Sequence, residues 1–196
     1  TGAKLLTLGG DHSITYPCIR AFERLGQLDI VQIDAHLDWV DAGEGIRYAN
    51  GRPMRRAMEH DFVRNMAQIG IRDVRSREHE FRTAEAAGSR IFTRQQVRER
   101  GVPAILDNLP VLGNVYVSID IDGSCPSIAP GTGSPTVDGL LYHEVRSLVQ
   151  GLAQRGNVVG FDVVEVNPMV DVNGQTSLLA STLIIEFLGA IFDAKR

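Results

Sequence analysis

The amino-acid sequence predicts an α/β protein, a three-layer α/β/α architecture with a mainly parallel sheet, from two observations. Short apolar stretches alternate with longer stretches of helical periodicity, which is the pattern of consecutive βαβ units. The apolar stretches IVQI, VYVSI and VVGFDVV contain few polar residues, as strands buried on both faces do. No repeat or low-complexity linker divides the chain, so we expect residues 1–196 to form a single domain.

The strands are expected where apolar runs end in turn or polar residues. Residues 4–8 form the first run, and Gly9 and Gly10 behind it indicate a turn. The other predicted strands cover residues 28–34, 62–71 (starting near Asn65), 114–120 and 158–166. In open α/β sheets ligands bind beyond the carboxyl ends of the strands, so polar residues that follow these runs are candidate site residues.

Helices are expected between the strands, where apolar residues recur every three or four positions. They cover residues 14–25, 75–87, 94–109, 140–155 and 175–194. Gly101 and Pro103 interrupt the third helix, and Pro17 fits only the first turn of the first. The apolar run 178–192 contains Glu186 and is too short to cross a bilayer, which predicts a buried or half-buried helix.

The charge and the cysteines argue against several classes of protein. A formal net charge of −4 and a pI near 5.7 indicate neither a nucleic-acid nor an anionic-membrane partner. Cys18 and Cys125 lie far apart and in no C-x-x-C arrangement, so no disulfide framework is expected. A reducing compartment, together with a chain that does not open on a signal peptide, predicts a cytoplasmic location.

Residues of the types that bind metals follow several of the predicted strands. Asp34, His36 and Asp38 occupy positions i, i+2 and i+4, which on an extended backbone lie on one face with about 6.6 Å between alternate Cα atoms. Asp120-x-Asp122 repeats this spacing after another strand. The candidate metal ligands are His12, Asp34, His36, Asp38, Asp120 and Asp122.

Four carboxylates in one pocket repel one another unless cations neutralise them. Two dications about 3.5–4 Å apart and bridged by aspartates suit this set better than one. Histidine and carboxylate ligands without a thiolate favour manganese and permit iron, nickel, cobalt or zinc. A lone D-x-D is more often a solvated turn, and His12 could lie at a helix cap, but the D-x-H-x-D cluster directly follows an apolar strand, where unpaired charges are costly.

Five motifs then resemble one known family, the ureohydrolases, which include arginase, agmatinase, guanidinobutyrase and proclavaminate amidinohydrolase. They are GGDHSIT (residues 9–15), DAHLD (34–38), SIDID (118–122), APGTGSP (129–135) and DVVEVNP (162–168). Their order is that of the family, and they cover nearly the whole chain. The resemblance implies an arginase/deacetylase-like fold, a homo-oligomer (trimer or hexamer), and a family length of about 300 residues, so that the N-terminal part of a longer chain is expected to be missing here.

The resemblance also implies roles for individual residues. His12 and Asp38 would bind one Mn²⁺, His36 and Asp122 a second, and Asp34 and Asp120 would bridge the two ions of each chain. Glu165 would pair with the guanidinium group of the substrate, whose planar donors match a carboxylate. A hydroxide shared by the ions would attack the guanidinium carbon, and Asp38 would pass a proton to the leaving amine, giving urea and an amine.

Two positions depart from the family pattern. The tract YANGRPMRRA (residues 48–57) resembles a loop of the agmatinase and guanidino-acid branch, but Asn50 replaces a histidine that assists proton transfer or contacts substrate. Cys125 stands where relatives usually carry aspartate. We therefore expect an agmatine-like guanidino substrate, and keep two alternatives: a same-fold hydrolase of a formimino or acetylated substrate, and a non-catalytic metal-binding or regulatory subunit.

The remaining conspicuous residues are expected to be structural or solvated. His60, His79 and His143 are predicted on the surface, and the arginines of residues 72–77 at a solvated helix start. Trp39 is predicted to pack in a wall of the site, and Gly131 and Gly133 to serve backbone geometry.

Overall fold

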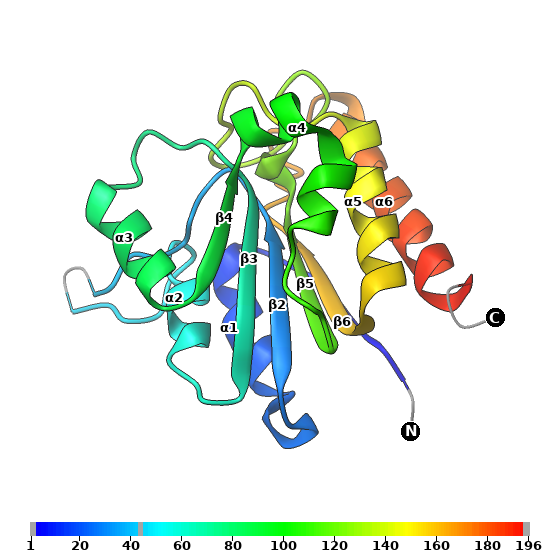
Figure 1. Ribbon diagram of the computed structural model, residues 1–196. Helices are drawn as coiled ribbons and strands as arrows, with labels where there is room; N and C mark the ends of the chain where they lie inside the picture. Colours follow the sequence, from blue (N-terminus) through cyan, green and yellow to red (C-terminus); the bar gives the residue numbers. More distant parts are fainter. Residues whose placement is uncertain (1–2, 43–44, 194–196) are drawn as a thin grey trace.

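A computed structural model describes residues 3–42 and 45–193, and its centre is one sheet of six parallel strands in the order β1-β6-β5-β2-β3-β4 (Figure 1). The strands are β1 (Leu5–Leu8), β2 (Leu28–Ile33), β3 (Val63–Ile71), β4 (Ser89–Thr93), β5 (Asn114–Asp120) and β6 (Asn157–Val164). Because all neighbours are parallel, every strand ends at the same edge of the sheet. The predicted parallel α/β architecture is confirmed.

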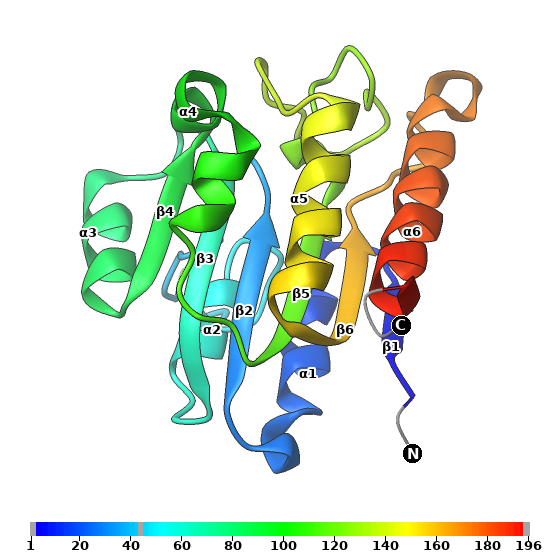
Figure 2. The same ribbon diagram turned by 45° about the vertical axis from the view of Figure 1, so that its right-hand side comes forward.

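Helices cover both faces of this sheet, as Figures 1 and 2 show from two directions. The helices are α1 (Thr15–Arg20), α2 (Pro53–Met58), α3 (Glu78–Ala86), α4 (Arg94–Asp107), α5 (Tyr142–Arg155) and α6 (Gln175–Asp193). Helices α4, α5 and α6 lie on one face, and α1 and α2 on the other. Short 3₁₀ turns are η1 (His12–Ile14), η2 (Glu23–Leu25), η3 (Ile121–Gly123) and η4 (Val172–Gly174).

Alternate residues of each central strand supply the two apolar layers. In β2, Val31 and Ile33 pack in the cluster under α4, α5 and α6, whereas Leu28 and Ile30 pack in the cluster under α1 and α2. This division follows from the two-residue repeat of a strand. It explains why the strands carry apolar residues at consecutive positions rather than at every second one.

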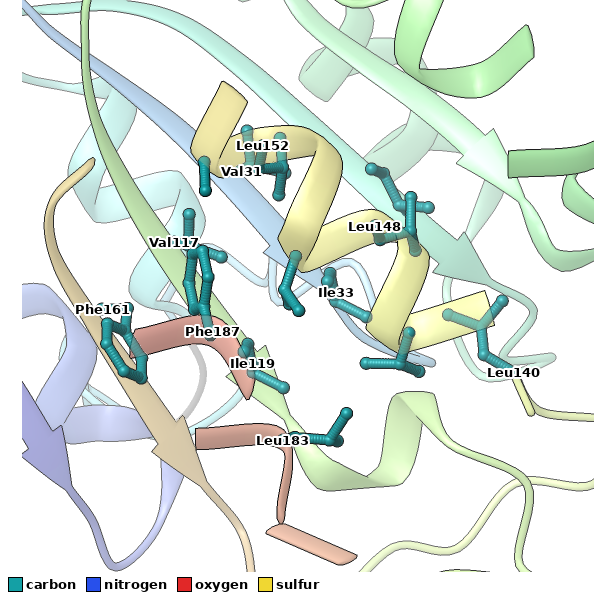
Figure 3. Packing of buried hydrophobic residues seen from close by; sticks show 14 of the residues in the cluster. Val31, Ile33, Val117, Ile119, Leu140, Leu148, Leu152, Phe161, Leu183 and Phe187 are labelled. Carbon is teal, nitrogen blue, oxygen red and sulfur yellow. The ribbon is translucent and has the colours of Figure 1, made fainter. Parts of the chain in front are cut away.

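The longest helix, α6, lies against α5 and β6 with part of its apolar surface turned inward (Figure 3). Phe187 is fully buried, and its ring centroid lies 4.8 Å from that of Phe161 in β6. Glu186 accepts hydrogen bonds from Tyr142, Arg146 and Gln150. By length and composition, Val172–Asp193 is the single helix of the described residues that could cross a membrane. Its contacts with α5 and β6 place it in the outer layer of the α/β fold, half-buried as predicted.

Truncation of Phe187 tests the role of α6 in the core. We expect Phe187→Ala to lower the free energy of unfolding by about 3–5 kcal/mol, because it removes a buried ring and leaves a cavity. Urea denaturation followed by circular dichroism measures this change. Leu178→Ala is the matched control, since Leu178 lies on the same helix and is 69% exposed. Equal losses in the two variants would contradict a core position for α6.

The predicted elements differ from the observed ones in three places. Strand β4 was not predicted, because it is short and alternates in exposure at the edge of the sheet. Helix α2 was not predicted either, since its six residues fall in a tract interpreted as a loop. The helix expected over 14–25 divides into η1, α1 and η2. Gly101 breaks the helical backbone of α4 with φ 76°, as predicted, whereas Ala194 lies outside the described residues.

Candidate metal centre

The six predicted ligands converge at the carboxyl edge of the sheet. His12 follows β1, and the Asp34–Asp38 segment follows β2. Asp120 is the last residue of β5, and Asp122 lies in η3. Strands β1, β6, β5 and β2 are consecutive neighbours, so their ends deliver these side chains to one place. Two glycines from other segments, Gly70 and Gly123, pack against the backbone of Asp34. A Cβ atom added at either glycine would lie 2.9 Å from a main-chain atom of Asp34.

Three carboxylates surround the buried ring of His12. Its Nδ1 atom lies 2.6 Å from Asp38 Oδ2, 3.2 Å from Asp34 Oδ2 and 3.2 Å from Asp120 Oδ2. Although these oxygens are close, Nδ1 makes no properly directed hydrogen bond. A buried nitrogen that faces three oxygens without such a bond has the environment of a metal ligand.

A second group forms around His36 and shares Asp34 with the first. His36 Nδ1 lies 3.1 Å from Asp122 Oδ2 and 3.4 Å from Asp34 Oδ1. Asp34 therefore turns one oxygen to each histidine. The potential ligand atoms of His12, Asp34 and Asp120, and those of Asp34, His36 and Asp122, each lie within 4.8 Å of one another. This arrangement fits two neighbouring cations that share the Asp34 carboxylate.

The electrostatics of the cluster also fit cations. Burial and the charge of Asp34 raise the pKa of Asp38 and of Asp122 to about 6. Burial lowers the pKa of His36, but its hydrogen bonds to the carboxylates of Asp122 and Asp34 outweigh burial and raise the pKa to about 11. Protons thus balance the carboxylate charge in the metal-free protein. Divalent cations on the same oxygens and nitrogens would replace those protons.

Buried polar side chains form hydrogen-bonded networks with the candidate ligands. Gln32 Nε2 donates to Asp34 Oδ2 at 2.5 Å, and its own oxygen accepts from Gln68 Nε2 at 2.6 Å. On the other side, His12 Nε2 lies 2.8 Å from the hydroxyl of Ser118, which donates to the buried Asp162 at 2.8 Å. Outer partners of this kind fix the ring nitrogens and carboxylates that face a metal.

A cavity of about 260 Å³ opens onto the cluster. Asn50 and Glu165 line it together with five of the six candidate ligands, all but Asp34, so both predicted non-ligand site residues lie at the site. Glu165 Oε1 accepts a hydrogen bond from the backbone N–H of His12 at 2.8 Å. Asp38 and Glu165 both have left-handed backbones, with φ 49° and 63°, a conformation that costs free energy and is concentrated at functional sites.

The predictions for Trp39, for the three other histidines and for the two glycines are confirmed in part. Trp39 is 3% exposed and forms part of the cavity wall, as predicted. His79 and His143 are exposed, whereas His60 is partly buried and lies 2.9 Å from the hydroxyl of Tyr16. Gly131 is needed for space, because an added Cβ would lie 2.8 Å from Asp171 Cα. No such clash exists at Gly133, whose nearest neighbour would be 3.8 Å away.

The prediction of a solvated Arg72 is wrong. Its guanidinium donates to a backbone carbonyl of β3 and to five carbonyls of the chain that follows β5, namely those of Gly70, Asp122, Gly123, Ser124, Thr136 and Val137. Burial lowers its pKa. Arg72 therefore holds the Asp122 segment in place, whereas Arg75 and Arg77 are exposed as predicted.

Asp73 and Arg75 line the cavity and were not identified from the sequence as site residues. They follow β3, the strand next to β2, at the edge where the other site residues lie. The signal available was the polar tract Arg-Asp-Val-Arg directly after an apolar strand.

Fold and site together define an α/β protein with a candidate centre for two metal ions at the carboxyl edge of its sheet. The chain belongs to the arginase family, whose model matches residues 1–189. It is 36% identical over 194 residues to the mitochondrial agmatinase of Gallus gallus (96% of this chain, 57% of the relative). It is also 36% identical over 189 residues to the guanidinobutyrase of Pseudomonas aeruginosa (93% and 59%).

Among solved structures, that of proclavaminate amidino hydrolase from Streptomyces clavuligerus superposes with a TM-score of 0.88 at 37% identity. The match covers 98% of this chain and 65% of that one. The chain thus spans less than two thirds of the length of these relatives.

The protonation of the metal-free cluster predicts how stability depends on pH. The folded protein retains protons that the unfolded chain has lost: between 3.8 and about 6 at Asp38 and Asp122, and between 6.5 and about 11 at His36. The free energy of unfolding therefore falls as pH rises through both windows.

Differential scanning calorimetry of the chelator-treated protein should show this loss. We expect the melting temperature to fall by at least about 3–5 °C per pH unit between about pH 7 and pH 9, because the proton retained by His36 alone accounts for a slope of that size. With saturating Mn²⁺ the melting temperature should instead rise with pH, because metal binding requires deprotonated ligands. The same slope with and without metal would contradict the proposed cluster.

Proposed function

We propose that the protein hydrolyses a linear guanidino compound to urea and an amine at a centre for two Mn²⁺ ions. The observation that carries the proposal is the shared Asp34 carboxylate, which links the His12 and His36 groups below a cavity lined by Glu165. The names of the relatives, agmatinase and guanidinobutyrase, support a guanidino substrate.

The ligands are proposed to divide between the ions as the family resemblance implies: His12 and Asp38 on one, His36 and Asp122 on the other, Asp34 and Asp120 on both. The oxygen and nitrogen donors without a thiolate suit manganese. When bound, the two ions supply Lewis acidity and make a water reactive near neutral pH.

The residues around the cavity then orient the reactants. Glu165 projects from the end of β6 and is held by the His12 backbone, so its carboxylate can accept the N–H donors of a planar guanidinium. Asp38 lines the same cavity and is proposed to hold the attacking water and to pass a proton to the leaving amine. Asn50 can hydrogen-bond to the substrate but cannot transfer a proton as histidine would.

Two alternatives predict different outcomes. A same-fold hydrolase of a formimino or acetylated substrate would release a product other than urea. A non-catalytic homologue, motivated by Asn50, would bind metal without turnover. The carboxylates gathered around two histidines favour catalysis, because their burial is costly and a regulatory subunit has no use for an open cavity beside them. Homo-oligomerisation and the cytoplasmic location stay predictions.

The test is urea release by the manganese-loaded protein across agmatine, 4-guanidinobutyrate, arginine and guanidine. We expect turnover of at least one of these that is lost on chelation and absent in Asp120→Ala. Bound manganese with no urea from any of them would contradict the proposal and favour one of the alternatives.

A further inference from the structure

The mouth of the cavity carries one permanent cation among the described residues that line it, the guanidinium of Arg75. Its side chain is 62% exposed. The two acidic side chains near it, Asp73 and Glu80, are only 8% and 7% exposed. Of these three charged groups, Arg75 therefore has the greatest freedom to meet an incoming ligand.

Arg75 lies close to the candidate metal centre and makes two contacts there. Its Nε donates to Asp73 Oδ1 at 3.0 Å, and its Nη2 lies 2.5 Å from His36 Nε2. His36 turns its other nitrogen, Nδ1, toward Asp122 and Asp34. The guanidinium thus lies one imidazole ring away from the proposed position of the second ion.

The contact with His36 does not occupy the Nη groups of Arg75. An imidazole that binds a metal through Nδ1, like one protonated on both nitrogens, carries a hydrogen on Nε2, where it is a donor. The arginine guanidinium has donors only, so Nη2 and Nε2 form no hydrogen bond in either state. The Asp73 contact at Nε holds Arg75 at the mouth, and its two Nη groups are free for a ligand.

The acidic groups at the mouth are already committed. Glu80 Oε2 accepts the backbone N–H of Arg77 at 2.7 Å at the start of α3. Asp73 Oδ1 accepts from Arg75 itself. A ligand tail that carries an ammonium group would meet two carboxylates that are largely buried and already accept hydrogen bonds from the protein, whereas a carboxylate tail would meet the exposed planar fork that matches it.

We propose that Arg75 binds a carboxylate at the far end of the guanidino substrate, which makes the protein selective for guanidino acids over guanidino amines. The inference rests on the proposed function and refines it, since it departs from the agmatine-like substrate expected from the sequence. The substrate is then a zwitterion. Its guanidinium binds Glu165, which follows β6, and its carboxylate binds Arg75, which follows β3.

The test compares three substrates that share the guanidino group and differ in the tail: 4-guanidinobutyrate, agmatine and uncharged 1-butylguanidine. Each is measured with the manganese-loaded protein, Arg75→Gln and the control Arg77→Gln. We expect wild type to prefer the carboxylate, and Arg75→Gln to lower its kcat/KM roughly tenfold, the low end for a charged hydrogen bond because Arg75 is exposed. Turnover of 1-butylguanidine, and all values for Arg77→Gln, should change by no more than about twofold.

Manganese content distinguishes recognition of the tail from a disturbed His36. Equal manganese in wild type and Arg75→Gln, with loss confined to the carboxylate substrate, supports the assignment. Preference of wild type for agmatine, or an equal loss on all three substrates, overturns it while leaving the proposed function intact. No urea from any substrate overturns both.

Discussion

Replacement of Asp34 by asparagine is expected to remove at least one of two bound manganese ions and to lower kcat by about 10³-fold or more, because water activation and substrate positioning both depend on the ions. Asp34 is fully buried and turns one oxygen to each histidine group. Asparagine keeps the volume but offers one neutral oxygen in place of two charged ones. Metal content by atomic emission and urea release measure the two effects.

A matched control lies on the same strand. Asp29 is 1% exposed, at the opposite end of β2, where it pairs with Arg64 at 2.5 Å. Asp29→Asn removes an equally buried carboxylate and should lower the melting temperature, but it should leave manganese content and kcat unchanged. If the two variants lost metal and activity to the same extent, the loss would reflect general destabilisation, and the role proposed for Asp34 would be wrong.

Replacement of Glu165 by glutamine is expected to lower kcat/KM by about 10²-fold or more while leaving manganese content unchanged. Two hydrogen bonds from a guanidinium to a charged carboxylate are each worth about 1.5–3 kcal/mol, and a neutral amide reproduces them only in part. Glutamine still offers an oxygen to the His12 backbone, so the left-handed segment at Glu165 can persist. The ions are held by other residues.

The pattern of kinetic loss distinguishes binding from geometry. A rise in KM larger than the fall in kcat would place Glu165 in contact with the substrate ground state. Glu165→Asp retains the charge but shortens the side chain, and it should recover part of the lost kcat/KM if charge is what matters. An unchanged KM in Glu165→Gln would remove this residue from substrate binding.

The sequence was sufficient for the ligand cluster because the ligand-type residues follow apolar strands at fixed spacing. Asp34, His36 and Asp38 lie within five residues directly after β2, although the chain there bends at His36 and turns left-handed at Asp38 instead of staying extended as predicted. The parallel sheet brings His12 and Asp122 to the same edge. The fold class followed from the same alternation of elements. These features are local in the sequence or follow from the common direction of the strands.

Features that depend on contacts between distant segments were not predicted. Arg72 looks like a surface residue in the sequence, and only the fold shows the six carbonyl groups around it. Strand β4 becomes recognisable through its pairing with β3. Arg75 is recognised as a site residue only through its contact with His36, which exists because β2 and β3 are neighbours in the sheet.

Urea release as a function of bound manganese tests the central claim most directly. Metal-free protein is titrated with Mn²⁺ while the bound ions per chain and the initial rate are measured in the same samples, with the best substrate of the panel. The account predicts that the rate rises mainly with the second ion and reaches its maximum at two ions per chain. Full activity with one ion per chain, or no urea with two, would contradict a shared centre built on Asp34.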